Sequence, residues 1–380
     1  MRTIFSSAKH LVTPREQSAD FVELFFDLVF VYAITRITSL TAHNMETIQV
    51  IQSLLIFWLI WWGWTQFTWT LNAANTRVAE IRMLVLIATG VAFIMASSVD
   101  EAFGDSALWF ILPYVIIRTI GIGLYIRVTS SVVGDHSRII AFTVPSIIAW
   151  ILLIIGAFSD PPQRIWWWLT ATGFDLLSGY LGGRIDGWDV KPKHFAERHG
   201  LLVIIALGES LIVAATAVSS YGISQEIIIV GLLAVAVTCL LWWSYFSWIN
   251  EYLEEHLNKE SGIKQAKRAR NAYSFIHFPL IFGIIGMAVG FEKILSHPHD
   301  NLSTSVAFAL IGGYLLFVGF TAISVWSVSR LFLMPRFLIL IFSSIGIALT
   351  IGHPTYLALS IITVSLTLLT FIEWKKCRHS

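Results

Sequence analysis

Charged side chains interrupt several of the most apolar stretches of this chain, and they are the residues best suited to carry chemistry. Glu23 and Asp27 stand four positions apart, so a helix places both carboxylates on one face, where they repel each other unless a cation lies between them. Such a pair suits the handling of protons or cations. Glu23 has a second interpretation, because Asp20-Phe21-Val22-Glu23 is a variant of the capping box that closes the start of a helix.

Arginines and further carboxylates interrupt other apolar stretches. A charge at the centre of a bilayer costs about 2.5–3.5 kcal/mol on insertion scales, so it persists where it is paired, hydrated or functional. Arg36 follows Asp27 by nine positions, which is the opposite helix face, so its partner must come from another helix. We expect Glu209 or Asp175 to pair with Arg36, and Asp175 or another buried carboxylate to pair with Arg118. A structural ion-pair network and a transport path both account for these charges, and the sequence leaves both interpretations open.

A second polar group stands at residues 197–199. Three successive residues point around a helix rather than converging. We expect no metal site, because His194 and His199 are five positions apart and there is no second cluster. The chain contains no phosphate-binding glycine loop, no Gly-x-Ser-x-Gly and no His-Glu-x-x-His, so we expect no cofactor and assign no catalytic residue. The candidate residues of an ion or solute path, or of a buried charge network, are Glu23, Asp27, Arg36, Arg118, Asp175, Glu197, Arg198, His199 and Glu209.

The elements that must position these residues are membrane helices. Hydrophobic residues make up 56% of the chain and charged residues 13%, with a mean hydropathy of +0.73, whereas soluble domains carry about 25% charged residues. The net charge of +1 argues against a nucleic-acid partner, and the expected partner is the lipid bilayer. Twelve apolar segments approach the roughly 20 residues that a helix needs to cross hydrocarbon. They are residues 21–40, 49–71, 82–99, 107–127, 139–158, 165–183, 199–218, 226–249, 271–291, 303–327, 337–352 and 355–372.

Positive charges fall on alternate connections between these segments. Most of the 25 lysines and arginines lie in the two tails or in the even-numbered connections, and the exceptions are Arg36, Arg118, Arg164 and Lys293. Because positive charge marks the cytoplasmic side, we expect both termini in the cytoplasm and an even number of crossings. The sequence therefore predicts an all-α polytopic membrane protein with about twelve transmembrane helices. The charged connection 250–270 allows a short surface helix and is expected to lie solvated near lipid headgroups.

The two halves of the chain share features in the same order. Residues 21–23 (Phe-Val-Glu) open the first segment, residues 195–197 (Phe-Ala-Glu) stand at the start of the seventh, and segments two and eight each contain a tryptophan pair. We expect two six-helix repeats related by an axis along the membrane normal, since six crossings return the chain to the same side. The predicted divisions are a cytoplasmic N-terminal segment (1–20), a first repeat (21–184), a cytoplasmic linker (185–198), a second repeat (199–372) and a cytoplasmic tail (373–380).

Two separated motifs resemble those of a known family. Residues 21–31, Phe-Val-Glu-Leu-Phe-Phe-Asp-Leu-Val-Phe-Val, are similar to the opening signature of the bacterial low-temperature-requirement A (LtrA) family. Residues 195–201, followed by 205–210, are similar to its second hallmark. The resemblance covers nearly the whole chain and implies a protein of the bacterial cytoplasmic (inner) membrane, linked by name to growth in the cold. It brings no established substrate.

The first segment also resembles another group of proteins. Residues 26–35 are similar to the Phe-Ser-Asp-x-Val first helix of the endolysosomal potassium channels, which use six-span repeats whose first helices line the pore. The chain departs from that pattern at Phe26, where the motif has serine, and at Gly200-Leu201, where it has Ser-Asp. This resemblance implies that the first and seventh helices line a path.

Taken together, these observations favour passage of an ion or small solute, with Asp27 and Glu209 as the main carboxylates of the path. The alternative is a membrane-embedded enzyme acting on lipid or cell-wall precursors, with Glu23, Asp27 and His199 as acid–base groups. The solute, the coupling ion and a homo-oligomeric state stay open at this stage.

Overall fold

The computed structural model describes residues 11–12, 18–129, 137–182, 190–221, 224–297 and 299–377. The predicted N-terminal segment (1–20), linker (185–198) and tail (373–380) extend partly outside these ranges. The chain divides into two compact units. Unit 1 comprises residues 1–37, 50–198 and 257–270, and unit 2 comprises residues 38–49, 199–256 and 271–380.

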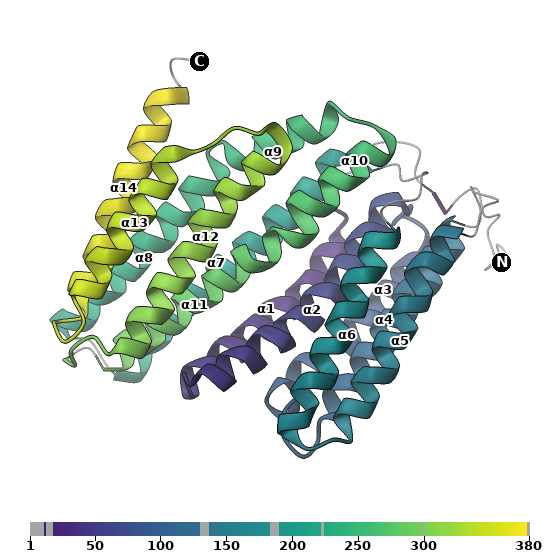
Figure 1. The fold of residues 1–380 in the computed structure, drawn as a ribbon, viewed down its shortest axis with the longest axis horizontal. Coiled ribbons are helices and arrows are strands. Elements are labelled where there is room, and N and C mark those ends of the chain that lie inside the picture. The colour runs from purple at the N-terminus through teal and green to yellow at the C-terminus, as the bar shows by residue number, and fades with distance from the viewer. Residues whose placement is uncertain are drawn as a thin grey trace. The chain divides into compact units, whose positions relative to one another are not determined.

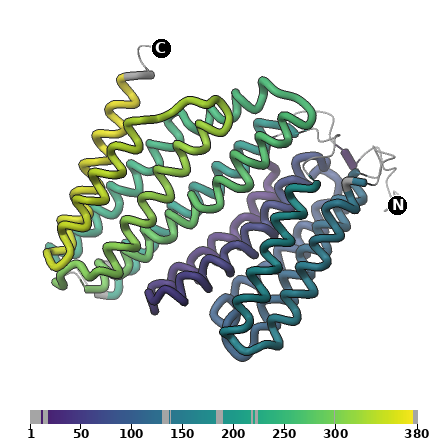
Figure 2. The backbone as a smooth tube through the Cα atoms, in the orientation of Figure 1, coloured from purple at the N-terminus to yellow at the C-terminus, as the bar shows by residue number. Residues whose placement is uncertain are grey.

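Helices make up almost all of the described chain (Figures 1 and 2). The first half contains α1 (Phe21–His43), α2 (Thr47–Ala73), α3 (Ala79–Ser97), α4 (Leu108–Thr129), α5 (Ser137–Ala157) and α6 (Pro161–Gly182). The second half contains α7 (Pro192–Tyr221), α8 (Gln225–Phe246), α9 (Ile249–Asn258), α10 (Gly262–Ala269), a π-helical turn (Arg270–Phe275), α11 (His277–Ser296), α12 (Thr304–Ser329), α13 (Met334–Leu349) and α14 (Tyr356–Cys377). Within the described ranges, β-structure is limited to two isolated bridges.

Each predicted apolar segment is helical over most of its length. Among the residues that the structure describes, nine helical stretches are long and apolar enough to cross a membrane: Thr47–Ala73, Ala79–Ser97, Leu108–Thr129, Ile139–Ala157, Pro192–Thr216, Gln225–Asn258, Gly262–Ser296, Thr304–Ser329 and Tyr356–Lys375. The charged helices α1 and α6 are not among the nine, and α13 is shorter. The all-α prediction is therefore confirmed, while the count of twelve crossings stays a prediction.

Large apolar side chains lie on the outside of these helices. Trp109 of α4, Trp166 of α6, and Phe342 and Leu349 of α13 are each between 66% and 75% exposed. Extended apolar surface of this kind leads to aggregation in water, whereas in a bilayer it faces lipid. The helices also satisfy their own backbone hydrogen bonds, as hydrocarbon requires.

In unit 1, α3 packs on α4, α4 on α5, and α5 on α6. Near the start of α6, Arg164 is only 3% exposed and joins the loops at that end of the unit. Its guanidinium donates hydrogen bonds to the carbonyl oxygens of Ala102, Gly104, Gly156, Ala157 and Ser159. Gly156 and Ala157 are the last two residues of α5, where a helix leaves carbonyl groups without regular intrahelical partners. Arg164, which the sequence shows only as an exception to the pattern of positive charges, therefore caps the end of α5.

In unit 2, α11 and α12 approach each other closely. A Cβ atom on Gly283 would lie 2.7 Å from the carbonyl oxygen of Gly313, and one on Gly313 would lie 2.6 Å from that of Gly283, so neither position admits a side chain without movement. The remaining helices complete the unit, with α8 on α11 and α14, and α13 on α12 and α14. The helical conformation is interrupted between α13 and α14, where Gly352 takes a φ of 80°.

Helix α7 begins earlier than the seventh predicted segment. Residues 192–198, assigned by the sequence to the linker, are its first two turns, and Pro192 opens it, where the fixed φ of proline suits a helix start. His194 and Arg198 are four positions apart on this helix and share a face. The early start therefore places a second i, i+4 pair on a regular helix, as Glu23 and Asp27 are on α1.

Candidate functional site: a buried charge cluster in unit 1

Glu23 takes part in the start of α1 as the capping box predicts. The backbone N–H of Asp20 donates to Oε1 of Glu23 over 3.2 Å, and the backbone N–H of Val22 donates to Oδ1 of Asp20 over 3.1 Å. These bonds satisfy donors that a helix start leaves free. The capping interpretation of Glu23 is thus confirmed, but its carboxylate is 0% exposed and has further partners.

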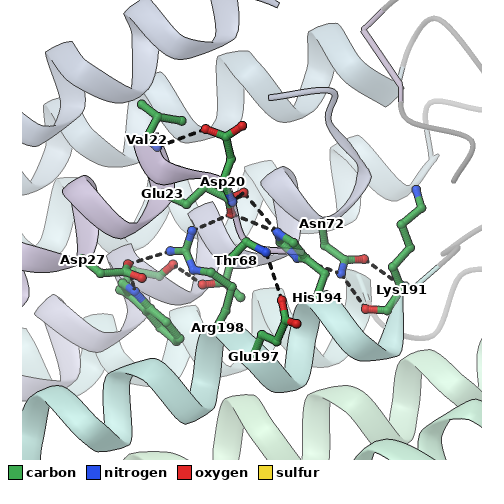
Figure 3. Close-up of polar contacts among 12 residues, drawn as sticks. Asp20, Val22, Glu23, Asp27, Thr68, Asn72, Lys191, His194, Glu197 and Arg198 are labelled. Carbon is green, nitrogen blue, oxygen red and sulfur yellow. Dashed lines mark hydrogen bonds and ion pairs between the residues drawn. The ribbon is translucent and has the colours of Figure 1, made fainter. Parts of the chain in front are cut away.

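Arg198 provides the cation that the two carboxylates of α1 require (Figure 3). Its Nη1 lies 2.6 Å from Oε2 of Glu23, and its Nη2 lies 2.7 Å from Oδ1 of Asp27. The three side chains are at most 1% exposed. Trp64 of α2 donates its indole N–H to the same Oδ1 over 2.7 Å, and its ring lies 5.6 Å from the guanidinium carbon. Charge-assisted hydrogen bonds of these lengths are among the strongest in proteins.

His194 and Asn72 extend this cluster toward the start of α7. Nε2 of His194 lies 3.1 Å and 3.0 Å from the two carboxylate oxygens of Glu23. Nδ1 of the same ring lies 3.2 Å from Nδ2 of Asn72, which also donates to the carbonyl of Lys191. Figure 3 shows this chain of contacts from Asp27 to Lys191. We use the name buried charge cluster for Glu23, Asp27, Trp64, Asn72, His194 and Arg198.

Asp27 keeps one carboxylate oxygen free. Its Oδ1 accepts from both Arg198 and Trp64, whereas its Oδ2 is buried and has no hydrogen-bond partner among the residues that the structure describes. Buried polar atoms are nearly always hydrogen-bonded, so an unpartnered carboxylate oxygen marks a position that calls for another group.

A second buried group in unit 1 pairs Arg118 with Asp175, as one of the sequence predictions states. Nη2 of Arg118 lies 3.3 Å from Oδ1 of Asp175, and both side chains are 0% exposed. Tyr114 accepts from Nη1 of Arg118 over 3.0 Å and donates to Oδ2 of Asp175 over 3.1 Å, while Ser146 accepts from Nη2. Oδ1 of Asp175 has this ion-pair contact but no hydrogen-bond partner among the described residues. One positive charge balances one negative charge in this group.

Arg36 pairs with a carboxylate of unit 1 other than the predicted Asp175. Its guanidinium contacts Asp100, in the turn that follows α3, and both side chains are partly exposed, at 33% and 44%. The prediction was wrong because it assumed a partner at equal depth in another apolar segment. A long arginine side chain near the end of α1 can instead reach a loop carboxylate.

The other predicted site residues on α7, Glu197, His199 and Glu209, have different surroundings. Glu197 accepts a hydrogen bond from the backbone N–H of Ala19 over 3.0 Å in unit 1. His199, the next residue but one, belongs to unit 2, where its ring lies 4.9 Å from that of Tyr273 and 5.5 Å from that of His277. Residues 197–199 thus point in different directions, as expected for successive helix positions. Glu209 is 3% exposed within unit 2 and interacts electrostatically with Glu292.

Sequence reasoning missed one buried ion pair altogether. Arg336 of α13 makes a two-pronged contact with Glu373 of α14, at 2.7 Å and 2.8 Å, and its Nη2 donates to the carbonyl of Ser244. Trp248 donates to the same carboxylate over 3.0 Å. The sequence places Arg336 in a connection and Glu373 in the tail. Only the lengths of α13 and α14 bring the two residues into the helical region.

Comparison with known proteins places this chain in a family. The sequence profile of the family described as "Bacterial low temperature requirement A protein (LtrA)" matches residues 18–371. The chain belongs to the LtrA family. It is 27% identical over 324 residues to an uncharacterized protein of Rhizobium meliloti (strain 1021). The alignment covers 80% of this chain and 76% of that protein. No solved structure matches.

The two motifs that resemble the LtrA signatures meet in the buried charge cluster. The stretch 21–31 contributes Glu23 and Asp27, and the stretch 195–201 contributes Arg198. With its LtrA assignment and its several apolar helices, the chain is a multi-pass membrane protein. The cluster also contains residues that no motif drew attention to, namely Trp64, Asn72 and His194. An asparagine and a tryptophan inside an apolar segment were the available signals.

Proposed function

We propose that this LtrA-family protein passes an ion or small solute across the bacterial cytoplasmic membrane. In this proposal the chain crosses the bilayer twelve times as two six-helix repeats with both termini in the cytoplasm. The alternation of positive charge along the sequence supports the topology. The break between units 1 and 2 at residues 198–199 coincides with the predicted boundary of the second repeat and supports the repeats.

The observation that carries the proposal is the free Oδ2 of Asp27 inside a buried cluster. A buried charge pair that serves only to lock helices together is electrically balanced, because a buried charge without a partner is costly. The Arg118–Asp175 group fits that description, because one guanidinium meets one carboxylate. Asp27 does not fit it, because it shares the guanidinium of Arg198 with Glu23 and its Oδ2 has no hydrogen-bond partner among the described residues.

The proposal assigns different roles to the two groups of unit 1. The Arg118–Asp175 group is structural and holds α4 to α6. The buried charge cluster is the binding position, where Asp27 meets the passing ion or solute. An ionisable residue in a membrane helix is by default a functional candidate, and here the charge balance around each carboxylate distinguishes Asp27 from Asp175.

Flux in proteoliposomes tests the proposal. The purified protein is reconstituted, and H⁺, K⁺ and Na⁺ movements are followed with entrapped indicators under an imposed gradient, together with osmotic swelling in small uncharged solutes. We expect wild-type vesicles to move at least one of these and Asp27→Asn vesicles to lose that flux. Asn retains the volume and the oxygen that Arg198 and Trp64 contact, so the variant should still fold.

The matched control is Glu80→Gln, which removes a carboxylate of unit 1 that pairs with Arg127 at the partly exposed end of the unit. It should keep wild-type flux. The proposal fails if wild-type vesicles are as tight as protein-free vesicles for every probe, or if Asp27→Asn conducts like the wild type. Turnover of a lipid-linked substrate by the purified protein without any flux would favour the enzyme alternative.

A further inference from the structure

We propose that Oδ2 of Asp27 is the binding position for an exchangeable proton, which makes the proton the coupled or transported ion. The inference rests on the proposed passage function and names its ion. Its basis is the charge balance of the buried charge cluster, which follows from the hydrogen bonds around Asn72 and His194.

The orientation of the Asn72 amide is fixed by the backbone. The N–H of Lys191 can only donate, and it lies 2.9 Å from the atom assigned as Oδ1 of Asn72, which must therefore be the oxygen. The other amide atom is then the nitrogen. Its two hydrogens point to the carbonyl of Lys191, at 2.9 Å, and to Nδ1 of His194, at 3.2 Å.

This orientation determines the protonation state of His194. Because Nδ2 of Asn72 donates to Nδ1, that ring nitrogen is an acceptor and carries no hydrogen. The single proton of the ring is on Nε2, where it is donated to the carboxylate of Glu23. A doubly protonated ring would place two donors against each other at Nδ1. His194 is therefore neutral in this structure.

The cluster consequently contains two carboxylates and one cation. Glu23 and Asp27 share the guanidinium of Arg198, and all three side chains are at most 1% exposed. The neighbouring elements bring no second cation, because α2 contains no charged or titratable residue. Of the other charged groups nearby, Asp20 and Arg82 pair with each other, and Glu197 accepts from the backbone of Ala19. The hydrogen bonds of Lys191 to Asn72 come from its backbone.

One uncompensated negative charge in such a place is costly, and a proton on Asp27 removes it. Burial of an unpaired ionised carboxylate in an apolar interior is so unfavourable that the group takes up a proton instead. The free Oδ2 is the position where that proton fits without disturbing an existing bond, since Oδ1 keeps both of its donors. Glu23 has no comparable vacancy because it accepts from Asp20, His194 and Arg198.

The surroundings favour a proton over a metal cation. Na⁺ or K⁺ in a dry site requires several oxygen ligands, whereas the oxygens beside Oδ2 are already occupied by N–H donors that repel a cation. Within the described residues there is also no group of three or more His, Cys, Asp or Glu side chains that could hold a metal ion. A proton needs only one oxygen.

Protonation of Asp27 also changes the interactions of Arg198 with the two carboxylates. With Asp27 neutral, the contact between Nη2 and Oδ1 changes from an ion pair to a hydrogen bond between a cation and a neutral acid, which is weaker. Arg198 is then held chiefly by Glu23. The proton comes from the aqueous phase and returns to it, and no other bond is formed or broken. Binding of this proton therefore weakens the contact between Asp27 of α1 and Arg198 near the start of α7.

Infrared difference spectroscopy on the purified full chain tests the inference independently of flux. A protonated carboxylic acid has a carbonyl stretch that a carboxylate lacks, and this band shifts in D₂O. We expect the wild type to lose such a band as pH is raised and Asp27→Asn to lack that band at every pH. Asp100→Asn, which removes a partly exposed aspartate that also pairs with an arginine, should retain it.

The outcomes separate this inference from the proposed function. Flux that depends on Asp27, without any protonated-acid band assigned to Asp27, would overturn the proton inference and leave the passage function standing. A band that disappears when Na⁺ replaces choline at constant pH would overturn it in favour of a sodium site. A band assigned to Asp27 in a protein that moves no probe would overturn the passage function and with it the coupling role of the proton. Melting curves of both variants verify that they fold.

Discussion

Replacement of Arg198 by methionine is the sharpest perturbation of the buried charge cluster. Arg198→Met keeps most of the apolar stem and removes only the guanidinium. Glu23 keeps its bonds to His194 and the backbone of Asp20, whereas Asp27 keeps only the indole N–H of Trp64. The two carboxylates of α1 then lie buried, one turn apart, with no cation between them.

The magnitude follows from the two bonds that are lost. Each hydrogen bond to a charged group contributes about 1.5–3 kcal/mol net, so bonds of 2.6 Å and 2.7 Å together are worth about 3–6 kcal/mol. The cost of removing one partner from a buried ion pair is about 3–5 kcal/mol, which agrees. At about 2–4 °C per kcal/mol for a cooperative unit of this size, the apparent melting temperature should fall by about 6–24 °C.

Thermal unfolding in detergent, followed by tryptophan fluorescence at fixed protein and detergent concentrations, measures this shift. The deficit of Arg198→Met relative to the wild type should shrink as pH falls, because protonation neutralises the carboxylates that the variant leaves unpaired. Adding Glu23→Gln and Asp27→Asn to the same chain should restore much of the loss. Arg127→Met, which breaks the partly exposed pair with Glu80, should cost only about 0.2–1 kcal/mol. A wild-type melting temperature for Arg198→Met would refute the reasoning.

Two further predictions concern the rest of the chain. Arg118→Leu should lower stability by about 3–5 kcal/mol, because it leaves Asp175 buried without its cation; the same melting assay measures this, and an unchanged midpoint would contradict a structural role for the pair. In a chain without its two native cysteines, Ser159→Cys should react with an impermeant thiol reagent added outside intact cells and Lys264→Cys should not. Labelling of position 264 from outside would overturn the proposed topology.

The helices themselves could be predicted from the sequence, because runs of about 20 apolar residues between polar connections leave a membrane chain no other regular structure. The Arg118–Asp175 pair was also within reach. Both residues interrupt apolar segments, neither has a partner on its own helix, and few opposite charges are available to either. Because few charged residues interrupt the apolar segments, each of them has few possible partners.

The main contacts of the buried charge cluster were not predictable from the sequence. Arg198 lies before the seventh apolar segment, and its direction is determined only by the start of α7 at Pro192, which places it on the face of His194. The prediction of a partner for Arg36 was wrong for a related reason. Asp100, a carboxylate in a loop, competes with any partner inside the membrane, and apolar periodicity carries no information about loop geometry. Hydropathy thus locates helices along the chain but does not specify which way their ends face.

The order in which the ribosome makes these residues sets a condition on biogenesis. Glu23 and Asp27 precede Arg198 by 175 and 171 positions, so α1 is complete long before its cation exists. At about 5–20 residues per second, the wait is roughly 9–35 s. During that interval Glu23 and Asp27 lie one helix turn apart without the guanidinium that contacts both of them in the finished structure, so protonation or hydration must offset their repulsion. The contact with Arg198 is therefore a late event in the folding of unit 1.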